Sequence, residues 1–173
     1  MVGVKMKDHD GEFVIDQARA DRVKVAIDYV QSRLFAVGFD AQIISELRVN
    51  PAYLLGRDDL AGTADIQIIG GGILEVIDYK DGVNLVSAKD NPQLELYVLG
   101  ALAALKLPIN GNYPFSRILM TIIQPKLALK GLNPITTHEV SLATALAWIP
   151  KYVMAAAATA APAAPLVPGA AQC

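Results

Sequence analysis

Three residues near the centre of the sequence have side chains that could do chemistry together: Asp65, Asp78 and Lys80. The runs 64–69 and 73–80 are rich in apolar and β-branched residues and flank three consecutive glycines, which favours a tight antiparallel hairpin. A connection of three or four residues would place Asp65 opposite Asp78 or the residue before it. The two carboxylates could then converge, because cross-strand Cβ atoms lie about 5 Å apart. Asp78 and Lys80, two apart on one strand, point to the same face.

This set carries more negative than positive charge, and the surplus predicts a bound cation. Burying unpaired carboxylates costs free energy unless a cation compensates them. A hard cation such as Mg²⁺ prefers oxygen ligands and usually keeps waters and phosphate oxygens. An ordinary ion pair between Lys80 and one aspartate is the simpler interpretation of the Asp-x-Lys pair alone. A third carboxylate, Glu46, lies in the preceding expected strand, as either a solvent-facing residue or a further ligand.

Four motifs follow one another in the centre of the chain. They are Glu46, Gly62-Thr63-Ala64-Asp65, Asp78-Tyr79-Lys80 and Gln93-x-x-x-Tyr97. Their order, with Gly-x-x-Asp in one strand, Asp-x-Lys in the next and Gln-x-x-x-Tyr opening a helix, resembles the RecB-like branch of the PD-(D/E)XK nucleases. Any single motif is common by chance, whereas all four in order are fairly specific.

A narrower likeness extends through the same region. The segments 76–82, 91–94 and 123–126 look like an uncharacterised group of phage and prophage proteins of that branch. The resemblance is strong over somewhat under half of the chain and weak over most of the rest. It implies a restriction-endonuclease-like α/β fold.

The resemblance also implies a role for each matched residue. Asp65 and Asp78 would be metal ligands, helped by the backbone carbonyl of Tyr79. Lys80 would orient or activate the attacking water and stabilise charge in the transition state. Glu46 would be an additional ligand.

Gln93 and Tyr97 are four residues apart and share one face of the expected helix. They would brace Lys80 or contact the DNA backbone, with core packing and helix capping as equal alternatives. Gly100, on the same face, would let this helix approach the sheet closely.

The activity implied by the resemblance is Mg²⁺- or Mn²⁺-dependent hydrolysis of DNA phosphodiester bonds in the bacterial cytoplasm. An exonuclease of phage recombination or replication fits better than a sequence-specific endonuclease. A phage single-strand annealing or recombination protein is a candidate partner, and a homo-oligomer remains open. Two alternatives also remain. One is a catalytically silent nucleic-acid-binding accessory protein with the same fold, and the other is an assembly protein that works through its Ala/Pro-rich tail.

The charge and cysteine content of the chain exclude several functional classes. The chain has 173 residues, 53% of them hydrophobic and 18% charged, with a formal net charge of −2, which argues against a non-specific nucleic-acid coat protein. The single cysteine, Cys173, excludes an intrachain disulfide and a cysteine-ligated cluster. The charged N-terminus has no apolar signal core, and the internal apolar run 96–105 is too short to span a bilayer, so no membrane partner is expected.

The remaining elements follow from periodicity and from helix-ending residues. We expect helices over 16–37, 93–105 and 142–158, and strands over 42–49 and 117–124, beside the central hairpin. The fold class is therefore α/β, with a mixed central β-sheet flanked by α-helices. The expected nuclease domain is 1–154, and residues 155–173 are an Ala/Pro-rich flexible tail.

Histidine is scarce in this chain. Many RecB-like nucleases carry a histidine in an N-terminal helix, and the expected helix 16–37 has none. His9 lies in a charged segment and is interpreted as solvated rather than as a ligand. His138 is expected in a loop or cap before the last helix.

Overall fold

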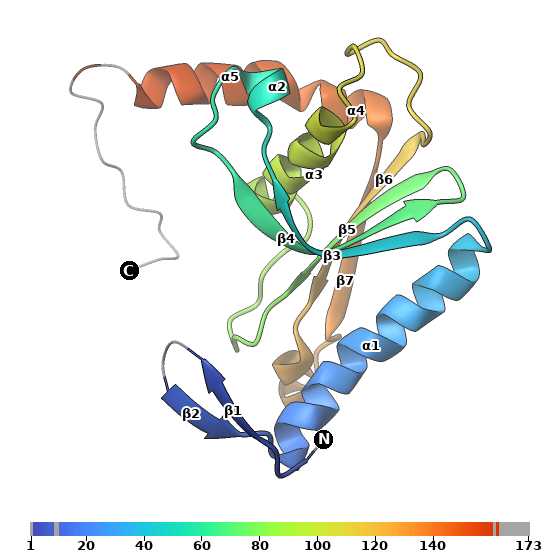
Figure 1. Ribbon diagram of the computed structural model, residues 1–173, viewed down its shortest axis with the longest axis vertical. Coiled ribbons are helices and arrows are strands. Elements are labelled where there is room, and N and C mark those ends of the chain that lie inside the picture. Colours follow the sequence, from blue (N-terminus) through green and yellow to red (C-terminus); the bar gives the residue numbers. More distant parts are fainter. Residues whose placement is uncertain (1, 9–10, 161, 163–173) are drawn as a thin grey trace.

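The computed structural model describes residues 2–8, 11–160 and 162 (Figure 1). Its centre is a five-stranded mixed sheet of β3 (Gln42–Val49), β4 (Gly62–Gly70), β5 (Ile73–Tyr79), β6 (Arg117–Ile123) and β7 (Ile135–Ser141). The helices are α1 (Gln17–Val37), α2 (Ala52–Leu55), α3 (Pro92–Ala104), the 3₁₀ helix η1 (Pro125–Lys130), α4 (Leu142–Leu146) and α5 (Trp148–Thr159). A separate hairpin, β1 (Lys5–Asp8) and β2 (Gly11–Val14), precedes α1.

The sheet has the order β3-β4-β5-β6-β7, and every neighbouring pair is antiparallel except β5 and β6. Helix α3 makes the crossover between these two parallel strands, as parallel pairing requires. Helix α1 lies on one face of the sheet, and α3, α4 and α5 pack on the other (Figure 1). The predicted fold class, a mixed central sheet flanked by helices, is confirmed, and the arrangement is consistent with the restriction-endonuclease-like class.

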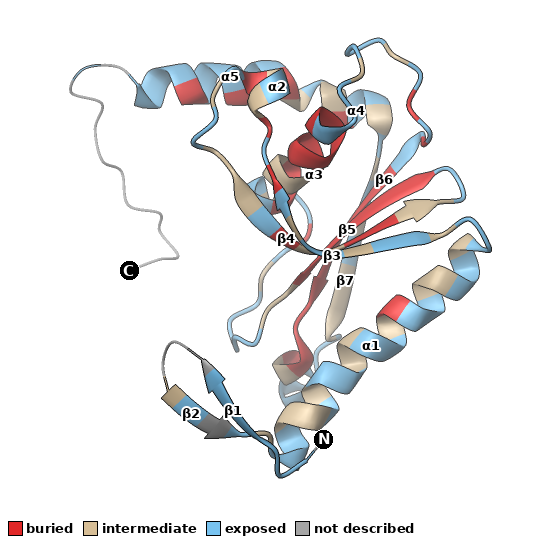
Figure 2. Ribbon diagram, viewed as in Figure 1, coloured by how far each residue is buried: buried red, intermediate tan, exposed pale blue. Residues whose placement is uncertain are grey.

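The core is concentrated at the middle of this three-layer arrangement. Figure 2 shows burial along β5, β6 and α3, whereas α1 and β3 are largely exposed. Strands buried on both faces read as almost continuous apolar runs, as β6 does at 118–123. The predicted strand at 117–124 was recognisable for this reason.

The β4–β5 hairpin turns through two residues, not the three or four expected from the sequence. Gly70 pairs with Ile73, and Gly71 and Gly72 between them have φ angles of 53° and 74°. Two successive positive φ angles are those of a type I′ turn, whose twist matches a hairpin and which glycine adopts without strain. In this register, continued one pair beyond its last partners, Asp65 lies opposite Asp78.

Capping residues explain both ends of α1 and the start of α3. The Asp16 side chain accepts a hydrogen bond from the Arg19 N–H at 2.6 Å, and Gly38 ends α1 at a φ of 107°. Asn91 accepts from two backbone N–H groups of the first turn of α3, with Pro92 at the first helical position. These side chains satisfy amide groups that a helix start leaves unpaired.

The prediction for His138 was wrong. This residue lies in β7, an edge strand, where it pairs with Met120 of β6. The run Thr136 to Glu139 is polar and carries little apolar alternation, so its strand character comes from pairing with β6. The sequence reading also missed α2, η1 and the β1–β2 hairpin. His9 lies outside the described residues.

The C-terminal region is helical for longer than the expected domain boundary. The expected helix 142–158 is divided into α4 and α5, and α5 includes residues 155–159 of the predicted tail. Ala156 is buried, and its carbonyl accepts a hydrogen bond from Arg57 at 2.7 Å. Residues 161 and 163–173 of that tail lie outside the described residues.

Within the described residues, one helical stretch, Leu142–Thr159, is long and apolar enough by composition to cross a membrane. It consists of α4 and α5, and its buried residues Ala145, Ile149 and Tyr152 belong to the core cluster around α3.

Gly100 confirms the expected close approach of α3 to the sheet. A Cβ atom at this position would lie 2.7 Å from the Cβ of Val49 in β3. Real Cβ atoms essentially never approach other atoms so closely, so only glycine allows the present spacing between α3 and β3.

Replacing Gly100 by alanine should therefore destabilise the fold. Alanine is the better helix former by about 1 kcal/mol, but overpacking a tight core contact costs about 1–3 kcal/mol. We expect a net loss in the free energy of unfolding, measured by urea denaturation. Gly82→Ala is the control, because a Cβ there meets no atom within 4 Å. A Gly100→Ala variant as stable as Gly82→Ala would contradict this account.

Candidate active site

Strands β4 and β5 separate at the point where the two aspartates lie. Their last paired residues are Ile66 and Ile77. Beyond this pair, Asp65 Oδ2 accepts a hydrogen bond from the backbone N–H of Tyr79 at 2.7 Å. The Asp65 side chain thus takes the place of the β4 backbone as the hydrogen-bond partner of the Tyr79 amide. The two strands separate at the carboxylates for this reason.

Lys80 is held by a chain of polar contacts that starts at Asp78. Its Nζ lies 2.8 Å from Asp78 Oδ2 and donates to Gln93 Oε1 at 2.9 Å. Gln93 Nε2 in turn donates to the Tyr97 hydroxyl at 2.8 Å and to Asp78 Oδ1 at 3.3 Å. The structure thereby joins the Asp-x-Lys motif of β5 to the Gln-x-x-x-Tyr motif of α3.

The glycine of the Gly-x-x-Asp motif makes room for this arrangement. A Cβ on Gly62 would lie 2.8 Å from Cε1 of Tyr97. The Tyr97 ring therefore packs directly over the β4 backbone, three residues from Asp65. The Gly-x-x-Asp motif of β4 and the Gln-x-x-x-Tyr motif of α3 are therefore in direct steric contact.

Glu46 lies on the other side of Asp65, in β3. The pairs Ser45–Ile66 and Leu47–Ala64 are in register, so Glu46 and Asp65 face each other in a gap between them. Glu46 has a φ of 52°, in the left-handed region that costs a non-glycine residue about 1–3 kcal/mol. Such local strain is often found at functional sites.

Glu46 is nevertheless exposed and is not grouped with both aspartates. In the part of the chain that the structure describes, no cluster of three His, Cys, Asp or Glu side chains could hold a metal ion. The structure thus brings together Asp65, Asp78, Lys80, Gln93 and Tyr97. It leaves Glu46 beside Asp65 without completing a three-carboxylate site.

Burial shifts the pKa of Asp78. The side chain is almost fully buried, and this desolvation raises the pKa of its carboxyl group. The hydrogen bond and positive charge of Lys80 oppose the shift, and the negative charge of Asp65 adds to it. The net effect is a raised pKa, so the favourable contacts of Lys80 do not outweigh the cost of burying the Asp78 carboxylate.

Asp78 is held less well than the other two buried carboxylates, because its hydrogen bond from Gln93 is long, at 3.3 Å, and its other oxygen has only an ion pair. Glu75 receives three side-chain contacts at 2.6–2.8 Å, and Glu95 receives two at 2.6–2.8 Å. The donors are Tyr29, Arg33 and Thr121 for Glu75, and Lys151 and Tyr152 for Glu95. Asp78 Oδ2 is buried and has the Lys80 ion pair but no hydrogen bond of good geometry within the described residues.

The residues present therefore fit a hard divalent cation. Mg²⁺ is commonly held by one or two carboxylates, with waters and substrate phosphate oxygens as the other ligands. Asp65 and Asp78 supply two such carboxylates with a surplus negative charge. An ion pair with Lys80 explains one contact of Asp78 and leaves the remaining charge unbalanced.

The loop between Lys80 and Gln93 is held by Gln124, a residue for which the sequence analysis predicted no role. Gln124 is buried, its Nε2 donates to the Asn84 carbonyl at 2.9 Å, and its Oε1 accepts from the Val86 N–H at 2.8 Å. Its sequence signal was membership of the 123–126 segment of the narrower likeness. The contact itself became visible only in the fold.

Charged residues fasten the start of the same loop. The Asp81 carboxylate forms two ion pairs, one with Nε of Arg22 in α1 at 2.8 Å and one with Nζ of Lys126 in η1 at 3.1 Å. Lys130 donates to the carbonyl of Val83 at 2.7 Å. Both neighbours of the loop, α1 and η1, thus hold the segment that follows Lys80.

Gln124→Ala should loosen this loop. The Val86 N–H and the Asn84 carbonyl would lose their partner, and each such hydrogen bond contributes about 0.5–1.5 kcal/mol. We expect faster hydrogen exchange at the Val86 amide, whereas Gln124→Glu keeps the acceptor and should preserve its protection. The exposed Gln42→Ala is the control. Unchanged Val86 protection in Gln124→Ala would show that Gln124 does not hold the loop.

The raised pKa of Asp78 predicts a pH-dependent stability. A carboxyl group with a folded pKa above its unfolded value stabilises the protein when protonated, and this contribution is lost as the pH rises through the folded pKa. The stability of Asp78→Asn relative to wild type should therefore increase as the pH rises from about 3.8, the ordinary value, towards neutrality. Urea denaturation across this range, in metal-free buffer, measures the difference. A difference that falls with pH would refute the assignment.

Comparison with known families covers almost the whole chain. The family model described as "Protein of unknown function (DUF2800)" matches residues 3–173. The match includes the β4–β5 hairpin, α3 and the Gln124 segment together. The chain therefore belongs to the DUF2800 family.

Proposed function

We propose that this protein is a divalent-metal-dependent nuclease that hydrolyses DNA phosphodiester bonds. The observation that carries the proposal is the pair of carboxylates, Asp65 and Asp78, at the opening of the sheet, with Lys80 2.8 Å from Asp78. The resemblance to RecB-like nucleases supports the same chemistry. Action as an exonuclease of phage recombination or replication rests on that resemblance alone.

Asp65 and Asp78, with the backbone carbonyl of Tyr79, are the residues that would hold Mg²⁺ or Mn²⁺. Glu46, on the neighbouring strand, is the further carboxylate available to the site. A bound divalent cation supplies Lewis-acid activation of water and neutralises charge on a phosphate.

Lys80 contributes the positive charge that the protein itself places at the site. Its ammonium group has three N–H donors, one of which bonds to Gln93 Oε1, while Nζ lies 2.8 Å from Asp78 Oδ2 as an ion-pair partner. A further N–H would be donated to a water molecule or a phosphate oxygen, where it would stabilise developing negative charge. Its partly exposed side chain can be reached by a substrate.

Gln93 and Tyr97 would act as positioning residues in this scheme. Gln93 accepts from Lys80 through Oε1 and donates through Nε2, so both ends of its amide are engaged. Tyr97 receives one of these bonds and is itself held against Gly62. Pre-arranged contacts of this kind reduce the reorganisation needed when charge develops.

A catalytically silent nucleic-acid-binding accessory protein is the second candidate. The observation that favours it is that Glu46 does not join the two aspartates, so the described residues form no three-ligand group. A protein of this kind would keep the fold and the polar contacts without turnover.

The proposal is tested by cleavage of end-labelled linear single- and double-stranded DNA with Mg²⁺ or Mn²⁺. We expect Asp78→Asn and Lys80→Met each to lose roughly 100-fold or more in rate, because the first removes an anionic metal ligand and the second removes the positive charge beside the reacting phosphate. Gln93→Ala should lose less, since Lys80 keeps its charge. Asp58→Asn and Lys24→Met, both exposed, are matched charge controls. Cleavage that begins at labelled ends identifies an exonuclease.

Other outcomes separate the candidates. A wild-type protein that binds Mn²⁺ and DNA without cleaving supports the accessory protein and overturns the nuclease. If Mn²⁺ binds neither wild type nor the controls, the carboxylates are a structural ion-pair site. Cleavage that survives both active-site substitutions would place the activity elsewhere.

A further inference from the structure

An apolar cleft adjoins the carboxylate pair on the opposite side from α3. It lies between α1 and strands β3 and β4 and has a volume of about 750 Å³. Asp65 and Glu46 both line it, so the cleft is continuous with the proposed site. A cavity of this size is within the range that holds small organic groups.

The walls of the cleft are exposed apolar side chains. Val23 and Ile27 of α1 and Ile43 of β3 are 45%, 49% and 47% exposed. Apolar side chains gathered in a cleft beside polar groups commonly mark a binding site. Two carboxylates lie among these walls, and no lysine or arginine belongs to the lining that the structure describes.

This combination of charge and polarity selects the kind of group that can enter. A phosphodiester inside the cleft itself would bring negative charge among its carboxylates without a cation to receive it, because Lys80 is not part of the lining. A nucleobase is neutral and planar, and its faces suit apolar and aromatic surfaces. The Tyr79 ring supplies an aromatic surface in the lining, and Gln31 and Ser45 supply polar atoms for a base edge.

We propose that this cleft receives an unpaired nucleobase of a single-stranded substrate, beside the phosphate that is cleaved. The inference rests on the proposed function, because it takes the scissile phosphate to lie at Asp65 and Asp78. Bases in a duplex are stacked and paired inside the helix, so they enter a side pocket only after unpairing. The substrate class is therefore single-stranded DNA or the unpaired end of a duplex.

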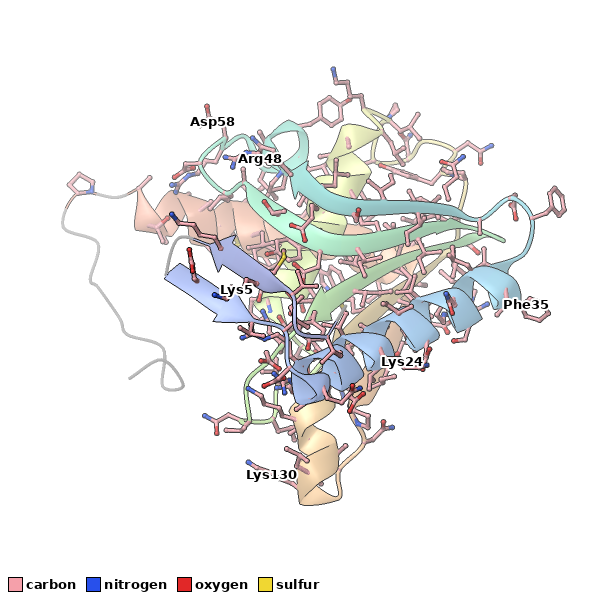
Figure 3. All side chains as sticks on the ribbon, turned by 60° about the horizontal axis from the view of Figure 1, so that its bottom comes forward. Lys5, Lys24, Phe35, Arg48, Asp58 and Lys130 are labelled. Atoms are coloured by element: carbon pink, nitrogen blue, oxygen red, sulfur yellow. The ribbon has the colours of Figure 1, made fainter. Side chains whose placement is uncertain are left out.

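Two exposed wall residues and one control residue give variants that should fold. Ile27→Gln and Ile43→Gln make the walls polar without removing buried volume. Phe35→Gln changes an apolar residue of the same helix that is 92% exposed and is not part of the cleft. Figure 3 shows Phe35 projecting outward at the far end of α1.

The measurement is the dissociation constant for a short single-stranded oligonucleotide and for its duplex, with Ca²⁺ replacing Mg²⁺ to suppress cleavage. We expect wild type to bind the single strand about tenfold more tightly, which corresponds to roughly 1.4 kcal/mol and lies within the contribution of one stacked base. Ile27→Gln and Ile43→Gln should remove most of this preference, and Phe35→Gln should retain it.

Oligonucleotides with an abasic position, moved along the strand, test whether a base is the group bound. One abasic position should weaken binding to wild type but have little further effect on Ile27→Gln, because the same contact is then already lost. An abasic series without effect on wild type would overturn the inference and indicate that the cleft takes another occupant, such as an apolar peptide segment.

The outcomes also separate this inference from the proposed function. If the single-strand preference is lost in the cleft variants but no cleavage occurs in Mg²⁺ or Mn²⁺, the base site is supported and the nuclease is refuted. Metal-dependent cleavage with equal affinity for both DNA forms and unaffected cleft variants supports the nuclease and overturns the base site. Failure to bind either DNA form overturns both.

Discussion

The separation of β4 from β5 is the constraint on which the candidate site depends. Pairing ends at Ile66 and Ile77, and the backbone amide of Tyr79, two residues further along β5, bonds to the Asp65 side chain at 2.7 Å. A buried amide must be paired somewhere, so the Asp65 carboxylate stabilises a sheet opening that would otherwise cost free energy. The same opening exposes one end of the carboxylate pair to the cleft. Fold stability and site geometry therefore share one interaction.

The two faces of the sheet contribute different parts of this site. The α3 face supplies Gln93 and Tyr97, which hold Lys80, and the close contact of Gly100 with Val49 determines the spacing. The α1 face supplies an open apolar cleft that ends at Asp65. A polar, tightly packed side and an open apolar side thus meet at the same carboxylates. This asymmetry suits a site that must hold charge on one side and admit an organic group on the other.

Much of the fold was predictable because local rules and tertiary packing agree. Asp16 and Gly38 mark the ends of α1, Asn91-Pro92 marks the start of α3, and three glycines mark the hairpin. The convergence of Asp65 and Asp78 followed from strand alternation. Strand β7 was not predictable, because a run such as Thr136 to Glu139 has no apolar period of its own and becomes a strand only by pairing with β6.

The sequence by itself determined the α/β class, the main helices and strands, and the set of residue types able to hold a cation. Those features depend on periodicity, capping and turn chemistry, which act over a few residues. The tertiary structure alone decided the two-residue turn, the clamp of Gln124 on the 81–91 loop, the exposed position of Glu46 and the apolar cleft. Apart from the turn, these features join separate elements of the chain, such as Gln124 and Val86, which are 38 residues apart. Contacts of this kind depend on how whole elements pack, which local patterns do not specify.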